Sequence, residues 1–218
     1  MRPAAMPTEV EAKFRAETAE PLIELAGRPR LGRAILGSPR TVDEVDRYLD
    51  TDDGRLAAAR WACRLRSREG VTRISLKGPP IGAVEGWRHR RPEVEGPATD
   101  AVDPDGWPAS PALELLTRLR DGRPLLEHLR LYQARTERAV SLPDGTSIGT
   151  LTLDRVRMAA NGTDLGRLFV VELELDASSE SGEAELDGLA AELAATDGLV
   201  AEPRSKLEHA LDLIAERR

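Results

Sequence analysis

The stretch from Thr8 to Arg15, Thr-Glu-Val-Glu-Ala-Lys-Phe-Arg, carries ionisable side chains at every second position. In a β-strand this spacing places Glu9, Glu11 and Lys13 on one face and apolar residues on the other. Carboxylates can bind a hard divalent cation and an ammonium group can bind phosphate, so the row could line a charged cavity. A strand with one face in a core and its charged face in water would have the same pattern. This stretch alone leaves both interpretations open.

The same alternation recurs along the chain. Basic rows contain Arg64 and Arg66, then Lys77, Arg91 and later Arg135. Acidic side chains occupy alternate positions in further apolar stretches, namely Glu93, Glu95, Asp154, Glu172 and Glu174. Each row predicts a strand with an aliphatic face and an ionisable face. The chain therefore reads as about eight mostly antiparallel strands, with about five helices.

Turn and helix signals divide these strands. Hairpin turns are predicted at Glu69-Gly70, at residues 143–145 and at Asn161-Gly162. Leucine spacing predicts helices over residues 19–25, 111–119, 183–195 and 206–216, and a further helical turn over 125–129. Residues 27–39, broken by Gly and Pro, are predicted to form a loop with a short helical turn. Residues 47–51 read as a strand, although Val42, Val45 and Tyr48 also fit a helix. Pro92 predicts an edge strand or a strand start.

Composition excludes several classes of protein. The chain has 218 residues, a formal net charge of −7, three scattered histidines and a single cysteine, Cys63. The charge argues against a nucleic-acid or anionic-lipid partner, and no apolar run is long enough for a membrane span. One cysteine allows no internal disulfide and fits a reducing cytoplasm. The sequence thus predicts a cytoplasmic protein without membrane or nucleic-acid partners.

The charged faces could look into solvent or into a closed barrel. Pattern alone favours the solvated face. Exposed strand faces usually mix in Thr, Ser, Gln and Asn, however, and these rows are almost wholly ionisable. Eight strands can close a barrel around a ligand-sized interior, where buried charges must find partners. In such a barrel Arg64, Arg66, Lys77 and Arg135 could hold phosphate oxygens. The carboxylates of Glu9, Glu11, Asp154, Glu172 and Glu174 could hold Mg²⁺ or Mn²⁺. Bases that bind phosphate and acids that bind metal in one cavity are the combination that metal-assisted phosphoryl transfer requires.

The ordered motifs resemble the CYTH domain, the family of triphosphate tunnel metalloenzymes. Glu9-Val-Glu11-Ala-Lys13 resembles the family's first-strand Glu-x-Glu-x-Lys signature, which is weak alone. Further motifs follow in the family's order over residues 8–211: Tyr48-Leu-Asp-Thr51, Arg64-Leu-Arg66, Leu76-Lys77-Gly78, Arg91-Pro-Glu93-Val-Glu95, Arg135, Asp154-Arg-Val156, Glu172-Leu-Glu174 and Ser205-Lys206-Leu207. The chain is most similar to the CYTH portion of bacterial proteins that also carry a CHAD domain, without a CHAD segment of its own.

The resemblance implies an α+β fold: one domain over residues 1–218, an eight-stranded antiparallel barrel with helices packed around the outside, and a helical insert at about 109–130. It implies a metal-dependent hydrolase of a triphosphate phosphoanhydride bond, with inorganic triphosphate leading and Mg²⁺ or Mn²⁺ as cofactor. Alternatives are a class IV adenylate cyclase acting on ATP, and a non-catalytic module that binds triphosphate or polyphosphate. A homodimer is compatible with this assignment.

The resemblance also assigns roles to residues. Phosphate-binding positions are Lys13, Arg64, Arg66, Lys77, Arg91, Arg135 and Lys206. Metal-binding positions are Glu9, Glu11, Asp154, Glu172 and Glu174, with Glu93 and Glu95 as ligands or supporting groups. Catalytic roles fall to Glu11, Glu174 and Lys13. Gln133 and Ala134 stand where relatives usually have an additional base just before Arg135, and Leu153 stands where many have a second aspartate. Each charged residue could instead form an ordinary surface ion pair or be solvated.

Overall fold

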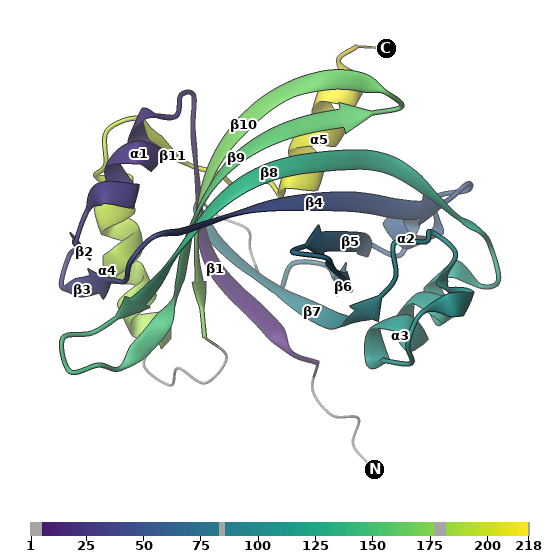
Figure 1. Ribbon diagram of the computed structural model, residues 1–218, viewed down its shortest axis with the longest axis horizontal. Coiled ribbons are helices and arrows are strands. Elements are labelled where there is room, and N and C mark those ends of the chain that lie inside the picture. The colour runs from purple at the N-terminus through teal and green to yellow at the C-terminus, as the bar shows by residue number, and fades with distance from the viewer. Residues whose placement is uncertain (1–5, 83–85, 177–181, 218) are drawn as a thin grey trace.

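Eight antiparallel strands of the computed structural model close into a barrel (Figure 1). The structure describes residues 6–82, 86–176 and 182–217. Around the barrel the strand order is β4-β5-β6-β7-β1-β10-β9-β8, and β8 pairs back onto β4. The strands are β1 (Thr8–Ala16), β4 (Arg40–Thr51), β5 (Ala62–Arg68), β6 (Val71–Lys77), β7 (Arg88–Ala98), β8 (Leu125–Ser141), β9 (Ser147–Ala160) and β10 (Thr163–Leu175). Because three strands separate β1 from β4 in either direction, these two strands lie on opposite walls.

Shorter elements cover the barrel. Within the described residues there are five α-helices, α1 (Glu20–Gly27), α2 (Arg55–Ala58), α3 (Pro111–Arg120), α4 (Gly182–Ala194) and α5 (Lys206–Ala215), and one 3-10 turn, η1 (Pro104–Gly106). Three short strands extend the sheet, β2 (Arg30–Leu31), β3 (Ala34–Leu36) and β11 (Leu199–Ala201). None of the described helices has the length and apolar character needed to cross a membrane.

Two apolar cores lie on the outer face of the barrel. One joins α1 and α4 to strands that include β1, with Phe14 fully buried at its centre. Burying a phenylalanine stabilises a fold by about 1.5–3 kcal/mol relative to exposure. The second core joins α2 and α3 to β5, β6 and β7. The aliphatic sides of the alternating strands therefore face outward onto helices, and their ionisable sides face inward.

Helix α5 packs differently. Its core includes Leu131, Val156 and Val170, which share strand faces with Arg135, Asp154 and Glu172. The helix therefore lies against the inward face of β8, β9 and β10, beyond the charged stretch (Figure 1). Its first residue, Lys206, enters the charged interior.

Several local predictions were wrong. Residues 125–129 form the start of β8 and not a helical turn, so the helix of the predicted 109–130 insert is α3 alone. Residues 30–36 form the β2–β3 hairpin instead of a loop. Strand β4 begins at Arg40, seven residues before its predicted start. Pro92 lies inside β7 and not at a strand start or on an edge strand. The pairing of β7 with β6 ends at Glu93, and the pairing of β7 with β1 ends at Pro92 itself. Because Pro92 lies where both ladders end, its missing N–H is tolerated.

Candidate functional site

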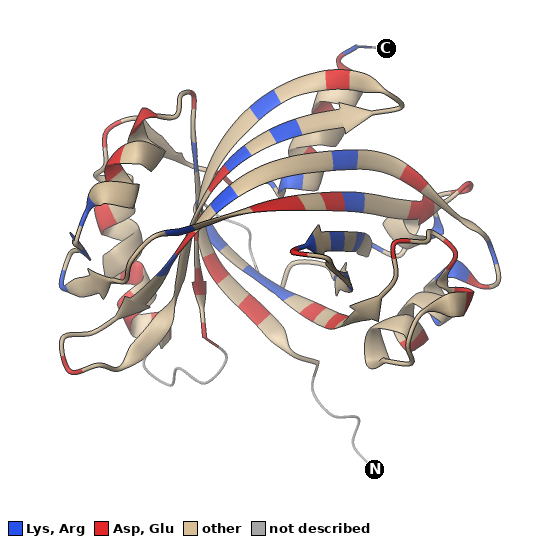
Figure 2. Cartoon of the chain, viewed as in Figure 1, with Lys and Arg blue, Asp and Glu red and all other residues tan. Residues whose placement is uncertain are grey.

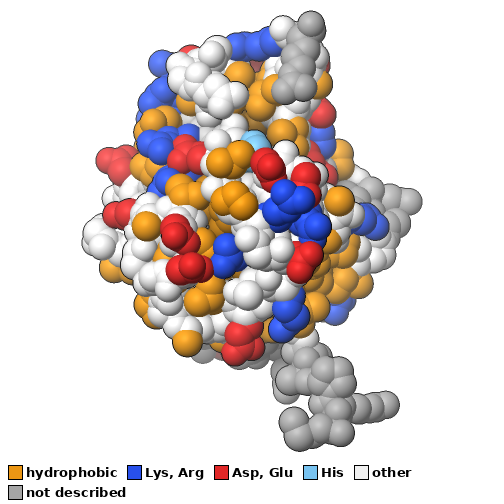
Figure 3. All heavy atoms as spheres, turned by 90° about the vertical axis from the view of Figure 1, so that its right-hand side faces the viewer, with side chains coloured by type: hydrophobic (Ala, Val, Ile, Leu, Met, Phe, Trp, Pro, Cys, Tyr) orange, Lys and Arg blue, Asp and Glu red, His pale blue; other side chains and the backbone are white. Residues whose placement is uncertain are grey.

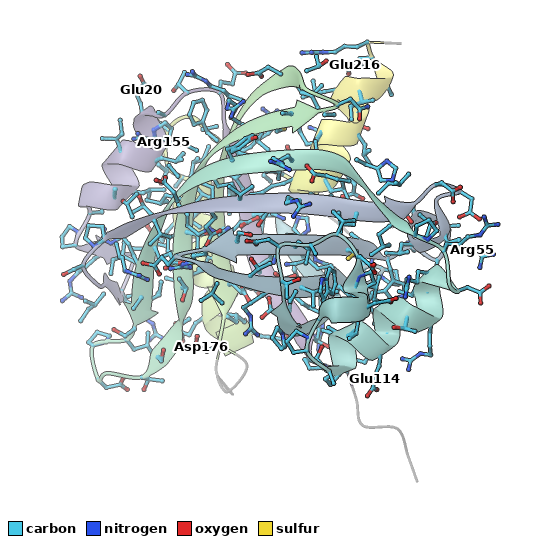
Figure 4. All side chains as sticks on the ribbon, turned by 45° about the vertical axis from the view of Figure 1, so that its right-hand side comes forward. Glu20, Arg55, Glu114, Arg155, Asp176 and Glu216 are labelled. Atoms are coloured by element: carbon cyan, nitrogen blue, oxygen red, sulfur yellow. The ribbon has the colours of Figure 1, made fainter. Side chains whose placement is uncertain are left out.

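The barrel encloses a charged cavity of about 580 Å³. All but one of the residues predicted for the site line this cavity: Glu9, Glu11, Lys13, Arg64, Arg66, Lys77, Arg91, Glu93, Glu95, Arg135, Glu172, Glu174 and Lys206. The exception is Asp154, which is completely buried behind Arg135 and Lys206. Bands of acidic and basic residues follow one another along the barrel strands in Figure 2. In Figure 4, by contrast, Arg55, Glu114 and Glu216 project outward from the periphery.

The charged side chains form a closed circuit of ion pairs around the tunnel wall, which we call the charge ring. Six acids alternate with six bases, each within 4.0 Å of the next, in the order Glu172, Lys13, Glu11, Arg91, Glu9, Lys77, Glu93, Arg64, Asp46, Arg66, Glu44 and Arg135, which returns to Glu172. The closest pairs are Lys77 Nζ to Glu9 Oε1 at 2.6 Å and Arg66 Nε to Asp46 Oδ1 at 2.7 Å. The interior thus neutralises its own charges.

Mutual neutralisation makes this burial tolerable. Burial alone would lower the pKa of Lys13, but Glu11 at 2.9 Å and Glu172 at 3.2 Å hold that pKa above its usual value. Burial would likewise raise the pKa of Glu9, yet Lys77 and Arg91 hold it well below the usual range. These groups therefore stay ionised in the folded protein at neutral pH.

Glu174 is the exception among the cavity carboxylates. It pairs with Glu11 across the β1–β10 ladder and forms no ion pair or side-chain hydrogen bond with the described residues. Glu174 is partly exposed to solvent at this position. Partial desolvation still raises its pKa, Glu9 and other carboxylates raise it further while Lys77 opposes them, and it reaches about 7. A carboxylate poised near neutral pH beside a charged cavity can accept a proton from water.

The two opposite walls differ in what faces the cavity. On the side of β5 and β8, which we call the arginine wall, Arg64, Arg66, Arg68 and Arg135 line the cavity. On the side of β1 and β10, which we call the carboxylate wall, the lining includes Glu9, Glu11, Glu172 and Glu174. A polyphosphate chain against the arginines and divalent cations against the carboxylates would each meet groups of opposite charge.

Two arginines of the arginine wall are held in the same way. Arg135 donates from Nε and Nη2 to Asp154, at 2.8 and 2.7 Å. Arg66 donates from the same two atoms to Asp46, at 2.7 and 2.8 Å. In both arginines Nη1 donates no hydrogen bond to the described residues. Each guanidinium therefore keeps donors free for a ligand while a buried aspartate fixes its plane.

Lys206 reaches the interior from α5. Ser205 caps this helix through a reciprocal capping box with Glu208, in which Ser205 Oγ accepts from Glu208 N at 3.1 Å. Lys206 Nζ then donates to Asp154 at 2.6 Å and to Glu172 at 2.8 Å. The cap thus fixes a base that links Asp154 to Glu172, in addition to the direct contact of Asp154 with Arg135.

Four charged residues of the interior were missed in the sequence. Glu44 and Asp46 on β4 are members of the charge ring and are 1% and 0% exposed. Arg68 lies 2.6 Å from Glu137, and both line the cavity. The signal was present, because Glu44 and Asp46 alternate with Val45 and Arg47 and continue to Tyr48 in the recognised motif. The competing helical spacing of Val42 and Val45 obscured it.

The donor set fits a hard divalent cation by chemistry. Oε1 of Glu11 is buried and lies 2.9 Å from Lys13 Nζ and 3.6 Å from Arg91 Nη2, while Glu174 lines the same cavity and forms no ion pair with the described residues. Oxygen donors of this kind suit Mg²⁺ or Mn²⁺. Among the described residues, no group of three or more Asp, Glu, His or Cys side chains is already arranged to coordinate a metal ion. The carboxylates are turned to the bases of the charge ring, so binding a cation requires some of these ion pairs to open.

Comparison with solved structures supports the fold. A candidate adenylate cyclase from Bacillus halodurans has a TM-score of 0.58 and 17% identity, and the match covers 94% of this chain and 98% of that one. A candidate adenylyl cyclase from Hippeastrum, described as having a dominant triphosphatase activity, has a TM-score of 0.55 and 16% identity over 94% and 95%. A protein from Pyrococcus horikoshii has a TM-score of 0.54 and 20% identity over 95% and 99%.

The sequence itself matches the CYTH domain over residues 7–211. No match was found among curated protein sequences. The closed barrel, its charged interior and the extent of this match agree with the motif order from Glu9 to Leu207. This chain belongs to the CYTH domain family.

Proposed function

We propose that this chain hydrolyses a phosphoanhydride bond of a triphosphate, with inorganic triphosphate as the leading substrate and Mg²⁺ or Mn²⁺ as cofactor. The observation that carries the proposal is Glu174, which lines the cavity without an ion pair to any described residue and has a pKa of about 7, whereas acids such as Glu11 and Glu9 are neutralised by bases. A binding module for anions alone would have no use for a poised proton acceptor.

The arginines and lysines would bind the phosphate chain. Arg64, Arg66 and Arg135 present guanidinium groups to the cavity from β5 and β8, while Lys13, Lys77, Arg91 and Lys206 approach from β1, β6, β7 and α5. Because these strands form a closed barrel, the cations contact a bound chain from several sides and hold it in line. Positioning is the main demand of phosphoryl transfer.

The carboxylate wall would hold the cation. Glu9, Glu11, Glu172 and Glu174 are the proposed ligands, with Glu93 and Glu95 in support; Asp154 can join only when Lys206 or Arg135 releases it. When bound, a divalent cation neutralises charge on the phosphate oxygens. Glu174, with Glu11 as the alternative base, accepts the proton of the attacking water. Lys13, between Glu11 and Glu172, stabilises negative charge that develops on the phosphate.

ATP is the alternative substrate, because two similar structures carry adenylate cyclase names. In that reaction the ribose hydroxyl would replace water as the nucleophile. A panel with tripolyphosphate, long-chain polyphosphate, ATP and thiamine triphosphate, each with Mg²⁺, Mn²⁺ or EDTA, separates the possibilities. We expect orthophosphate from tripolyphosphate and none in EDTA. Cyclic AMP from ATP would favour the cyclase, and binding without turnover under either metal would indicate a sensor.

A further inference from the structure

The least exposed acids of the charge ring have no role in the reaction described above. Glu44 and Asp46 are 1% and 0% exposed and do not line the cavity, so neither can contact a ligand there without a rearrangement. They lie on β4, directly opposite the strand that carries Glu9 and Glu11. Burying two carboxylates costs free energy unless groups of opposite charge pair with them.

Their contacts are with the cations of the arginine wall. Glu44 lies 3.2 Å from Arg66, 3.1 Å from Arg68 and 3.6 Å from Arg135. Asp46 binds Arg66 through two hydrogen bonds and lies 3.6 Å from Arg64.

Strand β4 is flanked by β5 and β8, which carry these arginines. Two acids on one strand thus hold arginines from both of its neighbours.

The hydrogen bonds of Asp46 hold its carboxylate in one orientation. Gln133 Nε2 donates to Asp46 Oδ2 at 2.8 Å, so both carboxylate oxygens accept hydrogen bonds. The pairing of Asp46 with Arg66 repeats that of Asp154 with Arg135, down to the donor atoms used. The pKa of Asp46 would be raised by burial but is held well below its usual range by Arg66 and Arg64, so it stays ionised.

We propose that Glu44 and Asp46 are positioning residues that aim Arg64, Arg66 and Arg135 into the cavity and limit how tightly the arginine wall holds a polyanion. This inference rests on the proposed binding of a triphosphate in the tunnel. A guanidinium held along its Nε–Nη2 edge presents Nη1 to phosphate in one orientation, which suits in-line positioning. The two negative charges behind the wall also offset part of its attraction for substrate and product, so that product can leave.

The test uses Asp46→Asn and Glu44→Gln, with Asp43→Asn as the matched control. Asp43 lies on the same strand but is exposed on its outer face and forms no ion pair with the described residues. Binding of tripolyphosphate in EDTA is measured by calorimetry, and kcat and KM by phosphate release with Mg²⁺. Thermal melting with and without tripolyphosphate reports on folding and binding together.

We expect each buried variant to bind tripolyphosphate at least threefold more tightly in EDTA and to lose at least tenfold in kcat. We also expect tripolyphosphate to raise its melting temperature by more than in the wild type, because the anion then neutralises uncompensated arginines. Asp43→Asn should match the wild type in every measurement. A merely structural role would lower affinity and kcat together.

Three outcomes decide the question. Folded Asp46→Asn and Glu44→Gln proteins with wild-type kcat and affinity would overturn the positioning role and leave the proposed function intact. Variants that are destabilised but gain no extra stabilisation from tripolyphosphate would also overturn it. A wild-type protein that neither binds nor hydrolyses tripolyphosphate would overturn both proposals at once.

Discussion

At the scale of single residues, Glu174 differs from the other cavity acids because it forms no ion pair with the residues that the structure describes. A pKa raised from 4.5 to about 7 means that the folded state disfavours the ionised carboxylate. Its contribution to stability is therefore favourable at low pH and is lost as pH rises through the interval from about 4.5 to 7. We expect Glu174→Gln to raise the melting temperature at pH 8 and to leave it nearly unchanged at pH 4.5. An equal effect at both pH values would contradict this assignment.

Lys13 shows the opposite situation, a buried base fully compensated by acids. Its side chain is 2% exposed and lies between Glu11 and Glu172. Lys13→Met should destabilise the protein by about 3–5 kcal/mol, because it breaks two buried ion pairs and leaves Glu11 with the more distant Arg91, at 3.6 Å. Arg40→Met is the control: Arg40 pairs with Glu69 at 2.6 Å, both side chains are 57% exposed, and its loss should cost less than about 1 kcal/mol. Urea denaturation compares the two; similar losses would argue against a buried ion-pair network.

At this scale, the sequence predicted which residues belong to the site, but not which of them contact one another. Alternation and motif order identified Lys13, Arg66 and Glu172, because a strand's period of two assigns each side chain to a face. It could not identify which acid neutralises which base, since pairs such as Lys77 with Glu9 and Arg135 with Glu172 join different strands whose stagger the sequence does not give. Asp154 illustrates the limit: it was predicted as a metal ligand, and its two oxygens accept hydrogen bonds from Arg135 and Lys206.

At the scale of elements, α5 is the one described helix that supplies side chains to the cavity. Ser205→Ala removes its N-cap and should cost about 1 kcal/mol of stability. It should also raise KM for tripolyphosphate, because Lys206 is the next residue. Ser110→Ala removes the N-cap of α3, where Ser110 Oγ accepts from Leu113 N at 3.2 Å, and should cost a similar amount without changing KM. Chemical denaturation and kinetics on both variants check this, and equal changes in KM would refute it.

Elements were predictable where periodicity was strong and turn signals were clear. The turn at Glu69-Gly70 has positive φ at both residues, 49° and 78°, as a tight hairpin requires. The short strands β2, β3 and β11 were missed because two or three residues carry no readable period. The start of β8 at Leu125 was mistaken for helix because its leucines follow directly on those of α3.

At the scale of the whole molecule, the charge ring balances six acids against six bases, so an added ion of either sign upsets it. Cation and polyphosphate should therefore bind cooperatively. We expect Mg²⁺ with a non-hydrolysable imidotriphosphate to raise the melting temperature by more than the two separate shifts added together. Additive shifts would show that the two ligands bind independently.

The outer surface has a different character from the interior. On the face shown in Figure 3, acidic and basic side chains are interspersed with apolar ones and form no large patch of one sign. Closure of the barrel was predicted from the resemblance of the ordered motifs to the CYTH domain, because the alternation of the strands alone favoured a solvated sheet face. The circuit of ion pairs was not, because it depends on the stagger between strands, which no single strand encodes.

The most direct test is phosphate release from tripolyphosphate at pH 8 by the wild type and by Glu174→Gln. Asp164→Asn, an exposed position on the same strand, serves as the control. We predict turnover by the wild type that EDTA abolishes, wild-type turnover by Asp164→Asn, and at least a 100-fold lower kcat in a folded Glu174→Gln protein, as expected for loss of a general base. Unchanged turnover in Glu174→Gln, or turnover that persists in EDTA, would contradict the account.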